Sequence, residues 1–460
     1  MTEKKYLKWY NKVGYGSGDI AGNVVYAFLS TFMMFYLTET IGMDIGIVGT
    51  LMAASKLFDG VTDIFFGSMI DKTHTKMGKA RPWMIYGYIG CAVTLAAIFM
   101  VPESWGETAQ YVYFFVAYTL LNAVFYTANN IAYASLTALI TKNSSERVQL
   151  GSIRFIFAFG TSLLIQYITI DAVNFFGGGA QGWKIVAIIY AVIGLVTNTI
   201  SGLSVKELSA EELDETDDKD LQEQEEKYTM VQAAKMLFTN KYYLMICGTY
   251  VGTQLYSSML NMGVYFMKNV LGDEGLLGDF SLAINIPLII GLLITPYLVK
   301  KFNGMYKINL IGYVVAIIGR TLVIVAGYMH SIPLMLVFTA VAAFGTSPLQ
   351  GDLNALIASC SEYTFLTKGK RIDGTMYSCS SFGIKVGGSI GTAMCGWLLD
   401  SAGFIEQAAV QTASAMNMLH IVYLWLPLAM TVIVTLILSR LDVEKANEKL
   451  SSTNNPSEYA

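Results

Sequence analysis

The sequence is poor in charged residues, cysteine and histidine, and each scarcity excludes a class of protein. Charged residues make up 14% of the 460 residues, whereas a typical soluble domain carries about 25%. The five cysteines show no paired spacing, which argues against a disulfide framework or a metal site. The three histidines are scattered, and no spacing typical of a metal site, a catalytic nucleophile or a phosphate-binding loop is found. We therefore expect no enzyme activity, no cofactor and no nucleic-acid partner.

Long apolar runs dominate the chain instead. Residues of the hydrophobic class make up 54% of the sequence, and the mean hydropathy is +0.49. Stretches near or above ~20 apolar residues recur from end to end, each long enough to cross about 30 Å of hydrocarbon. No signal peptide is expected, because Asp19 interrupts the first run and no cleavage site follows. The pattern predicts an all-α membrane protein with twelve transmembrane helices, near 13–41, 45–70, 83–101, 110–141, 149–175, 184–204, 240–268, 277–299, 308–328, 333–359, 374–400 and 408–438.

Basic residues gather in alternate loops, which sets the predicted orientation. Lys and Arg precede the first predicted helix and follow the second, fourth, eighth and tenth, whereas the intervening loops are nearly free of them. Lys184 and Lys268 are the exceptions. The positive-inside rule then puts both termini in the cytoplasm of a cell membrane that the chain crosses many times.

One polar segment divides the chain. Residues 205–235 are rich in Asp and Glu and are predicted to form a solvated cytoplasmic connector. Six-helix bundles are expected on either side, at 1–204 and 236–440, followed by a cytoplasmic tail at 441–460. This is the plan of the major facilitator fold, in which two bundles rock around a central site.

Two carboxylates lie one helical turn apart in the second apolar run. Asp59 and Asp63 share a helix face, and a carboxylate at membrane depth costs about 2.5–3.5 kcal/mol on insertion scales. A structural ion pair with Lys56, Arg154 or Lys385 would be one reason to keep them. The other is binding of Na⁺, which hard oxygen donors suit, or of a proton. We predict that Asp59 and Asp63 hold the Na⁺ or H⁺.

The end of the same run carries a further acid. Asp71 is followed by Lys72, and Arg81 lies in the same basic loop, before the next predicted helix. We expect Asp71 and Arg81, together with Arg371 in a second basic loop, to tie helix ends together as a cytoplasmic gate.

A polar stripe crosses the first apolar run. Asp19, Asn23 and Tyr26 recur at i, i+4 and i+7, so they share one helix face. A carboxylate, an amide and an aromatic ring on one face suit a sugar, whose hydroxyls bind the polar groups while its apolar face stacks on the ring. A packing stripe satisfied by neighbouring helices is the alternative.

Other polar residues lie in the fourth, fifth and eleventh predicted helices. Thr127 and Asn130 offer neutral oxygens at i and i+3, able to complete a cation shell or to bind a sugar. Arg154 and Lys385 are cations inside apolar helices and need partners. We expect Lys385 to reach a carboxylate of the opposite half, and we include Ser381 among the substrate-binding residues.

Three stretches resemble the glycoside–pentoside–hexuronide:cation symporters, and the likeness extends over nearly the whole chain. They are Gly-Tyr-Gly-Ser-Gly-Asp at 14–19, the run at 59–83 that holds both helix 2 acids and ends in Gly-Lys-Ala-Arg-Pro-Trp, and the run at 367–378. The resemblance implies that the helix 2 acids bind the coupling cation with help from Thr127. It implies sugar-binding roles for Asp19 and Arg154, and a place near the cation site for Lys385.

The chain also departs from the family pattern. Asn130 stands where the pattern has a second sugar-binding acid, and Ala134 where it has a stacking tryptophan. Gly60 and Ile64 replace prolines often found after the helix 2 acids. The identity of the sugar therefore stays open.

The residues and the resemblance together predict a secondary active symporter that imports a glycoside or related sugar by alternating access. A glucuronide, a xyloside and a galactoside are all compatible with the pattern, as are Na⁺ and H⁺. The same fold carrying a lysolipid or an organic acid, or a membrane sensor that binds a sugar without moving it, are the alternatives. The expected partners are the sugar, a monovalent cation and membrane lipid, and the chain is expected to be a monomer.

Overall fold

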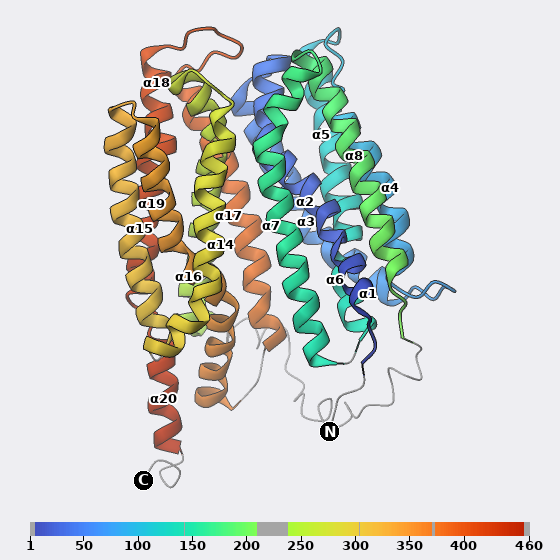
Figure 1. Ribbon diagram of the computed structural model, residues 1–460, viewed down its shortest axis with the longest axis vertical. Helices are drawn as coiled ribbons and strands as arrows, with labels where there is room; N and C mark the ends of the chain where they lie inside the picture. The colour runs from blue at the N-terminus through green and yellow to red at the C-terminus, as the bar shows by residue number, and fades with distance from the viewer. Residues whose placement is uncertain (1–4, 142, 209–237, 303, 370–372, 455–460) are drawn as a thin grey trace. The chain divides into compact units, whose positions relative to one another are not determined.

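The computed structural model describes residues 5–141, 143–208, 238–302, 304–369 and 373–454. Inside its helices, the description leaves out the side chains of residues 57, 59–61, 63–64, 67–68, 71, 138, 144–145, 148, 354, 373–382 and 453–454. Within these limits the protein is built of helices (Figure 1), and β-structure is confined to a bridge between Thr75 and Gly78.

The first six membrane segments include two that change helix type along their length. A π turn has i→i+5 hydrogen bonds and holds one more residue than an α turn; these turns are labelled η. The six segments are α1 (Trp9–Gly16) with α2 (Gly18–Phe28), η1 (Leu29–Met33) and η2 (Tyr36–Ile41); α3 (Ile45–Asp71); α4 (Arg81–Ile98); α5 (Glu107–Thr119) with η3 (Leu120–Tyr126) and α6 (Thr127–Leu139); α7 (Ser144–Phe175); and α8 (Gly179–Ser204).

The second six segments repeat this plan and end in one further helix. They are α12 (Lys241–Asn261) with α13 (Gly263–Phe266) and η4 (Met267–Leu271); α14 (Leu276–Phe302); α15 (Met305–Tyr328); α16 (Ile332–Lys368); α17 (Asp373–Ser401); and α18 (Ala413–His420) with η5 (Ile421–Trp425) and α19 (Leu426–Leu438). The further helix, α20 (Val443–Asn454), lies in the predicted tail.

Within the described residues, the twelve predicted membrane helices are thus confirmed, and the protein is a multi-pass membrane protein. By length and composition alone, seven helices in the described part of the chain are apolar enough to cross a membrane. The predicted helix at 333–359 is too short. The chain is helical from Ile332 to Lys368, and Gly369, with φ +68°, ends the helix.

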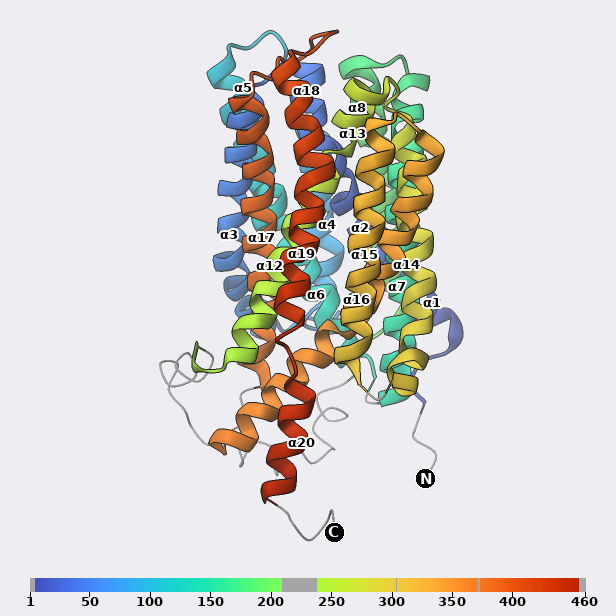
Figure 2. The ribbon, with the colours of Figure 1, turned by 90° about the vertical axis from the view of Figure 1, so that its left-hand side faces the viewer.

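The chain forms two compact units. Unit 1 contains residues 1–216, 264–278 and 392–418, and unit 2 contains residues 217–263, 279–391 and 419–460. The core of unit 1 is rich in fully buried aromatic rings: Phe28 stacks on Phe99 at 4.3 Å between ring centroids, and Trp183 lies 5.9 Å from the same ring. In unit 2, α15 packs closely on α16 and both α12 and α15 pack on α19, four helices that can be followed in Figure 2.

Two late segments of the chain are held in unit 1 by polar contacts with early residues. Lys268 forms an ion pair with the buried Glu39, and the hydroxyl groups of Thr38 and Tyr265 lie 2.7 Å apart. In the second of these segments, Glu406 accepts a hydrogen bond from the backbone N–H of Ile45 at 3.0 Å. These contacts join residues that are more than 200 positions apart in the sequence.

Two glutamates fasten the start of corresponding helices. Glu207, which follows α8, accepts hydrogen bonds from the backbone N–H groups of residues 79, 80 and 81 at 2.7–2.9 Å, where α4 begins. Glu444, near the start of α20, accepts from the N–H groups of residues 305 and 306 at 2.8–3.0 Å, where α15 begins. Each carboxylate satisfies N–H groups that lack a partner within their own helix. Glu207 belongs to the segment that the sequence predicts to be a connector, and residues 209–235 of that segment lie outside the described residues.

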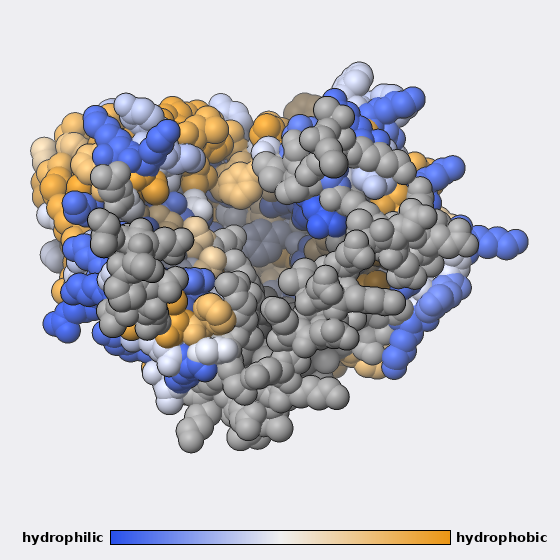
Figure 3. Space-filling view, turned by 90° about the horizontal axis from the view of Figure 1, so that it is seen from below, coloured by the Kyte–Doolittle hydropathy of each residue, from blue (hydrophilic) through white to orange (hydrophobic). Residues whose placement is uncertain are grey.

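The start of the described chain, just before α1, carries exposed charged residues, Lys5 and Lys8. Figure 3 shows the view from below, and hydrophilic residues, coloured blue, project around its edges. The basic loop at 72–80 between α3 and α4 contributes exposed lysines, since Lys72, Lys76 and Lys79 are all exposed.

Candidate functional site

The candidate sugar site is built around Asp19, in the first turn of α2. The α-helical hydrogen bonding is interrupted at Ser17, whose hydroxyl donates to the carbonyls of Gly14 at 2.7 Å and Thr197 at 3.1 Å. A new helix N-terminus therefore begins inside the membrane segment, and the partial positive charge of that end favours a carboxylate in the first turn.

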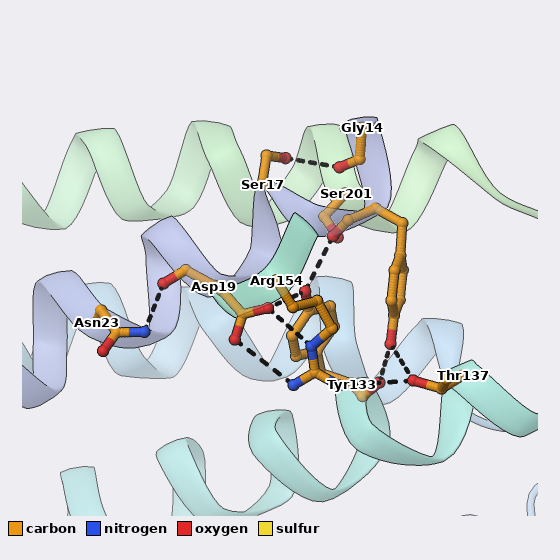
Figure 4. A network of polar contacts seen from close by, with 9 residues as sticks. Gly14, Ser17, Asp19, Asn23, Tyr133, Thr137, Arg154 and Ser201 are labelled. Carbon is orange, nitrogen blue, oxygen red and sulfur yellow. Dashed lines mark hydrogen bonds and ion pairs between the residues drawn. The ribbon is translucent and has the colours of Figure 1, made fainter. Parts of the chain in front are cut away.

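Arg154, on α7, is the ionic partner of Asp19. Its Nε donates to Asp19 Oδ2 at 2.8 Å, and its Nη2 lies 3.5 Å from Oδ1 (Figure 4). The two side chains are 25% and 15% exposed, so the pair is largely shielded yet reachable. Because the charges cancel, the pair offers a solute both donors and acceptors without a net charge.

Two tyrosines hold this pair in place. Tyr133 Oη, on α6, lies 2.6 Å from Asp19 Oδ2 and 3.0 Å from the carbonyl of Tyr15. The guanidinium carbon of Arg154 lies 4.3 Å from the centroid of the Tyr133 ring, which is a cation–π contact. Tyr15 is buried against Tyr133, and its Oη lies 2.8 Å from Thr137 Oγ1. The carboxylate therefore has a fixed orientation.

A glycine makes room for this arrangement. A Cβ added to Gly18 would lie 2.6 Å from Cε2 of Tyr133 and 2.8 Å from the hydroxyl oxygen of Ser201, closer than side chains tolerate. Ser201 Oγ in turn donates to the carbonyl of Tyr15 at 2.6 Å. Residue 18 must lack a side chain for Tyr133 to reach Asp19.

The other two members of the predicted stripe differ in their surroundings. Asn23 donates from Nδ2 to the backbone carbonyl of Asp19 at 2.9 Å, one turn earlier in the same helix. Tyr26 is 54% exposed, so its ring is open to a ligand. Their roles toward a sugar stay predictions.

The predicted residues of the fourth membrane segment, both in α6, differ in burial. Thr127 is buried and donates to the carbonyl of Asn122 at 2.8 Å, at the end of η3, which leaves its oxygen lone pairs available. Asn130 is exposed. Its neighbour Asn129 is buried and structural, since its Nδ2 donates to the carbonyl of Met84 at 2.7 Å and to Asn198 Oδ1 at 3.1 Å.

Several predicted residues lie wholly or partly outside the description. Asp59, Asp63 and Asp71 are in α3, and Ser381 is in α17, but their side chains are outside the described residues, as is the whole of Arg371. The cation site and the gate built on them therefore stay predictions.

Two predicted cations are described. Arg81 donates from Nε to the carbonyl of Gly202 at 2.9 Å, which joins the start of α4 to the end of α8. Lys385 is partly buried on α17. It belongs to unit 2 whereas Asp19 belongs to unit 1, so its approach to that carboxylate stays a prediction.

A separate carboxylate anchors the start of the chain. Glu146 accepts hydrogen bonds from the N–H groups of Tyr6 and Leu7, both at 3.1 Å, and from the Thr141 hydroxyl at 2.7 Å, and Lys12 lies 3.3 Å away. Burial works to raise the pKa of Glu146, but these hydrogen bonds outweigh burial and the pKa is lowered.

Sequence reasoning missed Tyr133, Thr137 and Tyr15 as parts of the site. Tyr133 and Thr137 recur at i and i+4, the spacing of one helix face, and that was the available signal. Nothing in one sequence indicates that this face meets Gly18.

Comparison with known proteins gives the class and then the family. The family model described as "MFS/sugar transport protein" matches residues 14–445. An isoprimeverose transporter of Lactiplantibacillus pentosus is 30% identical over 93% of this chain and 87% of its own length. A glucuronide carrier protein homolog of Escherichia coli K12 is 26% identical, covering 88% of this chain and 86% of its own length.

Solved structures share the fold. A bacterial homolog of the human lysosomal transporter Spinster, in an inward-facing and unoccupied conformation, has a TM-score of 0.68 at 13% identity, and the match covers 96% of this chain and 97% of that chain.

The protein is therefore a sugar transporter of the major facilitator superfamily. Within that class the chain belongs to the glycoside–pentoside–hexuronide:cation symporter family.

Proposed function

We propose that the protein imports a glycoside together with Na⁺ or H⁺, and that the Asp19–Arg154 pair is where the sugar binds. The observation that carries the proposal is the neutral, partly accessible ion pair beside aromatic rings. Sugar hydroxyls accept hydrogen bonds from a guanidinium and donate to a carboxylate, while the apolar face of the ring stacks on an aromatic side chain.

The geometry supports a defined role for each group. Asp19 Oδ2 is already occupied by Arg154 and Tyr133. Among the described residues, Oδ1 has only the long 3.5 Å contact with Arg154, so it retains capacity to accept from a hydroxyl. Arg154 retains N–H groups for sugar oxygens. The accessible ring of Tyr26 offers a stacking surface.

We assign the coupling of cation and sugar transport to Asp59 and Asp63 on α3. A cation at Asp59 and Asp63, assisted by Thr127 and Asn130, would offset one of the two negative charges and favour the sugar-binding conformation. The two ligands couple only if they prefer the same state of the protein. The membrane potential contributes about 2.3 kcal/mol per charge per 100 mV to cation entry.

The cellular setting is part of the same proposal. We place the protein in the cell membrane with both termini in the cytoplasm, as a monomer in contact with lipid, and without enzymatic activity. Asp71, Arg81 and Arg371 would close its cytoplasmic side, and Ser381 and Lys385 would complete the sugar site.

Uptake into proteoliposomes tests the function. The substrates are isoprimeverose, which the relative's name suggests, and a panel of glucuronides, xylosides and galactosides, each under separate Na⁺ and proton gradients. We expect gradient-driven accumulation of at least one glycoside, abolished in Asp19→Asn. Accumulation that is unchanged in Asp19→Asn would contradict the assigned sugar site.

The coupling residues need a separate variant. Asp63→Asn is expected to retain exchange of sugar across the membrane but to lose accumulation driven by the cation gradient. Intact gradient-driven uptake in this variant would show that the cation binds elsewhere.

A further inference from the structure

Unit 1 has a groove that shares no residue with the proposed sugar site. Its volume is about 380 Å³, within the range of about 300–1,000 Å³ that is usual for small-molecule sites. It lies between the end of α3, the start of α4 and the junction of η3 with α6. The lining is mostly apolar, and the lining residues used below are Phe66, Thr73, Trp83, Tyr86, Gly87 and Phe125.

Contacts within unit 1 hold the walls of the groove. Trp83 Nε1 donates to Thr73 Oγ1 at 2.7 Å, and the centroid of the Trp83 ring lies 6.0 Å from that of Phe66 in an edge-to-face arrangement. The ring of Phe125 lies against Gly90 of α4, where an added Cβ would clash with it. The groove therefore has a defined shape.

The groove opens on an apolar face of α4. Tyr86 in the lining is exposed, and so are Ile89 and Val93, which follow it at i+3 and i+7. Residues at this spacing share one helix face. An exposed apolar face on a membrane helix is a surface for lipid chains, so we expect the groove to be accessible from the lipid.

Two lysines border the groove. Lys72 adjoins Thr73 of the lining in the sequence. Lys76 adjoins Met77, whose sulfur lies 4.0 Å from Tyr86 Oη. Both lysines are exposed. The apolar groove thus has positive charge at the end nearest the loop.

Nearby acids cancel only part of this charge. Residues 72–81 contain four Lys or Arg and no acid. Asp71 precedes them, and Glu207 accepts hydrogen bonds from the backbone N–H groups of residues 79–81, so positive charge is in excess. Among the described residues, no carboxylate oxygen lies within 4 Å of Lys72 or Lys76.

We propose that the groove binds an acyl chain of an anionic phospholipid whose phosphate lies at Lys72 and Lys76. The apolar lining suits the chain, and basic residues beside membrane helices suit an anionic headgroup. Trp83 and Tyr86 have the amphipathic rings that are usual at the level of the headgroups. The inference goes beyond the proposed transport of a sugar and does not depend on it.

Quenching of Trp83 fluorescence tests this proposal. The purified full-length protein in detergent is titrated with phosphatidylglycerol or phosphatidylcholine that carries dibrominated acyl chains. The signal of Trp83 is the difference between the wild type and Trp83→Phe. We expect half-maximal quenching at an about tenfold lower concentration of phosphatidylglycerol, the effect of two lysines beside one anionic headgroup. Equal half-points for the two lipids would overturn the inference.

Charge variants test the role of the two lysines. Lys72→Gln/Lys76→Gln should reduce the preference to less than about twofold, whereas Lys72→Arg/Lys76→Arg should keep it. Lys300→Gln/Lys301→Gln is the matched control, because these lysines are exposed at the end of α14 in unit 2. A preference that survives in the first variant, or that the control also loses, would contradict a headgroup site at this loop.

A third variant fills the groove. A Cβ added at Gly87 would make only ordinary contacts with Asn129, so Gly87→Leu should fold and should raise the half-point for both lipids. Gly160→Leu on α7 is the control, since no described atom lies within 4 Å of its added Cβ. Unchanged quenching in Gly87→Leu would mean that the lipid binds elsewhere. Melting curves and gel filtration report whether each variant is folded.

Discussion

Single residues determine how Asp19 is oriented in the candidate sugar site. Asp19 is oriented by two neighbours from different helices, Arg154 on α7 and Tyr133 on α6. The Tyr133 hydroxyl is uncharged and contacts Asp19 Oδ2, the oxygen that Arg154 Nε also contacts. Its contribution is therefore to hold the Asp19 side chain in one rotamer. Loss of such a contact is expected to affect binding more than folding.

The first prediction concerns that hydroxyl. Tyr133→Phe keeps the ring under Arg154 but removes a hydrogen bond to a carboxylate, which is typically worth about 1.5–3 kcal/mol. We expect the affinity for the transported glycoside to fall about tenfold or more, measured by calorimetry. Tyr190→Phe is the matched control, because Tyr190 bonds to Thr169 and not to Asp19. Equal effects of both variants would contradict a specific role for Tyr133.

The second prediction concerns pH and Glu146. The folded protein lowers the pKa of this glutamate, so its contribution to stability is complete above the ordinary glutamate value of about 4.3 and is lost as the pH falls through the lowered pKa. We expect Glu146→Gln to lower the melting temperature at pH 7 and to make it less sensitive to acid. Melting curves between pH 7 and pH 3 measure this. Glu103→Gln, at an exposed position, is the control, and an unchanged acid response in Glu146→Gln would contradict the assignment.

The candidate site was partly predictable at this scale. Asp19 and Arg154 could be found because a charged residue inside an apolar run requires an explanation. Their direct pairing could not, because the residues are 135 positions apart and Lys385 was an equally good partner by composition.

At the scale of elements, the helices follow from hydrophobicity, and their ends follow from individual polar residues. Twelve apolar runs predicted twelve membrane helices because no other structure but a closed barrel satisfies the backbone in lipid. The ends are less predictable, because they depend on distant partners. Glu207 and Glu444 each reach the start of a helix from more than 100 positions away.

The third prediction concerns these two glutamates. Replacing a side chain that caps a helix typically costs about 1 kcal/mol, or roughly 2–4 °C in melting temperature for a cooperative unit of about 150–250 residues. We expect Glu207→Ala and Glu444→Ala each to lower the melting temperature of the purified protein by such an amount.

Glu103→Ala should have no such effect, since Glu103 is exposed and its side chain caps no helix in the described part of the chain. Protease cleavage of the loop at 72–80 should increase in Glu207→Ala alone. Equal cleavage of this loop in both cap variants would contradict a local role for each glutamate.

At the scale of the molecule, the two compact units do not coincide with the two halves of the sequence. Segments 264–278 and 392–418 belong to unit 1, although both come from the second half of the chain. Alternating access would require contacts between these segments and the first half of the chain to open during each cycle. The contact between Gly46 on α3 and Asp400 on α17 can be tested by a cross-link.

The fourth prediction is a reversible cross-link. A Cβ added at Gly46 would lie 3.1 Å from the Cβ of Asp400, within a few tenths of an ångström of the usual disulfide range of about 3.5–4.5 Å. We expect oxidised Gly46→Cys/Asp400→Cys protein to lose glycoside uptake and to recover it with dithiothreitol. The single variants are the controls. Full uptake with a disulfide verified by mass spectrometry would show that this contact stays closed throughout transport.

The π turn η3 has a consequence for how Tyr133 is aimed. Each added residue turns a helix by about 100° but lengthens it by only about 1.5 Å, and η3 ends seven residues before Tyr133. Deleting one residue there, such as Ala123, would restore α geometry. The residues that follow, including Tyr133, would then be rotated about the helix axis. If Asp19 binds the sugar as proposed, recognition would thus depend on the number of residues in η3, which supplies none of the groups described around Asp19.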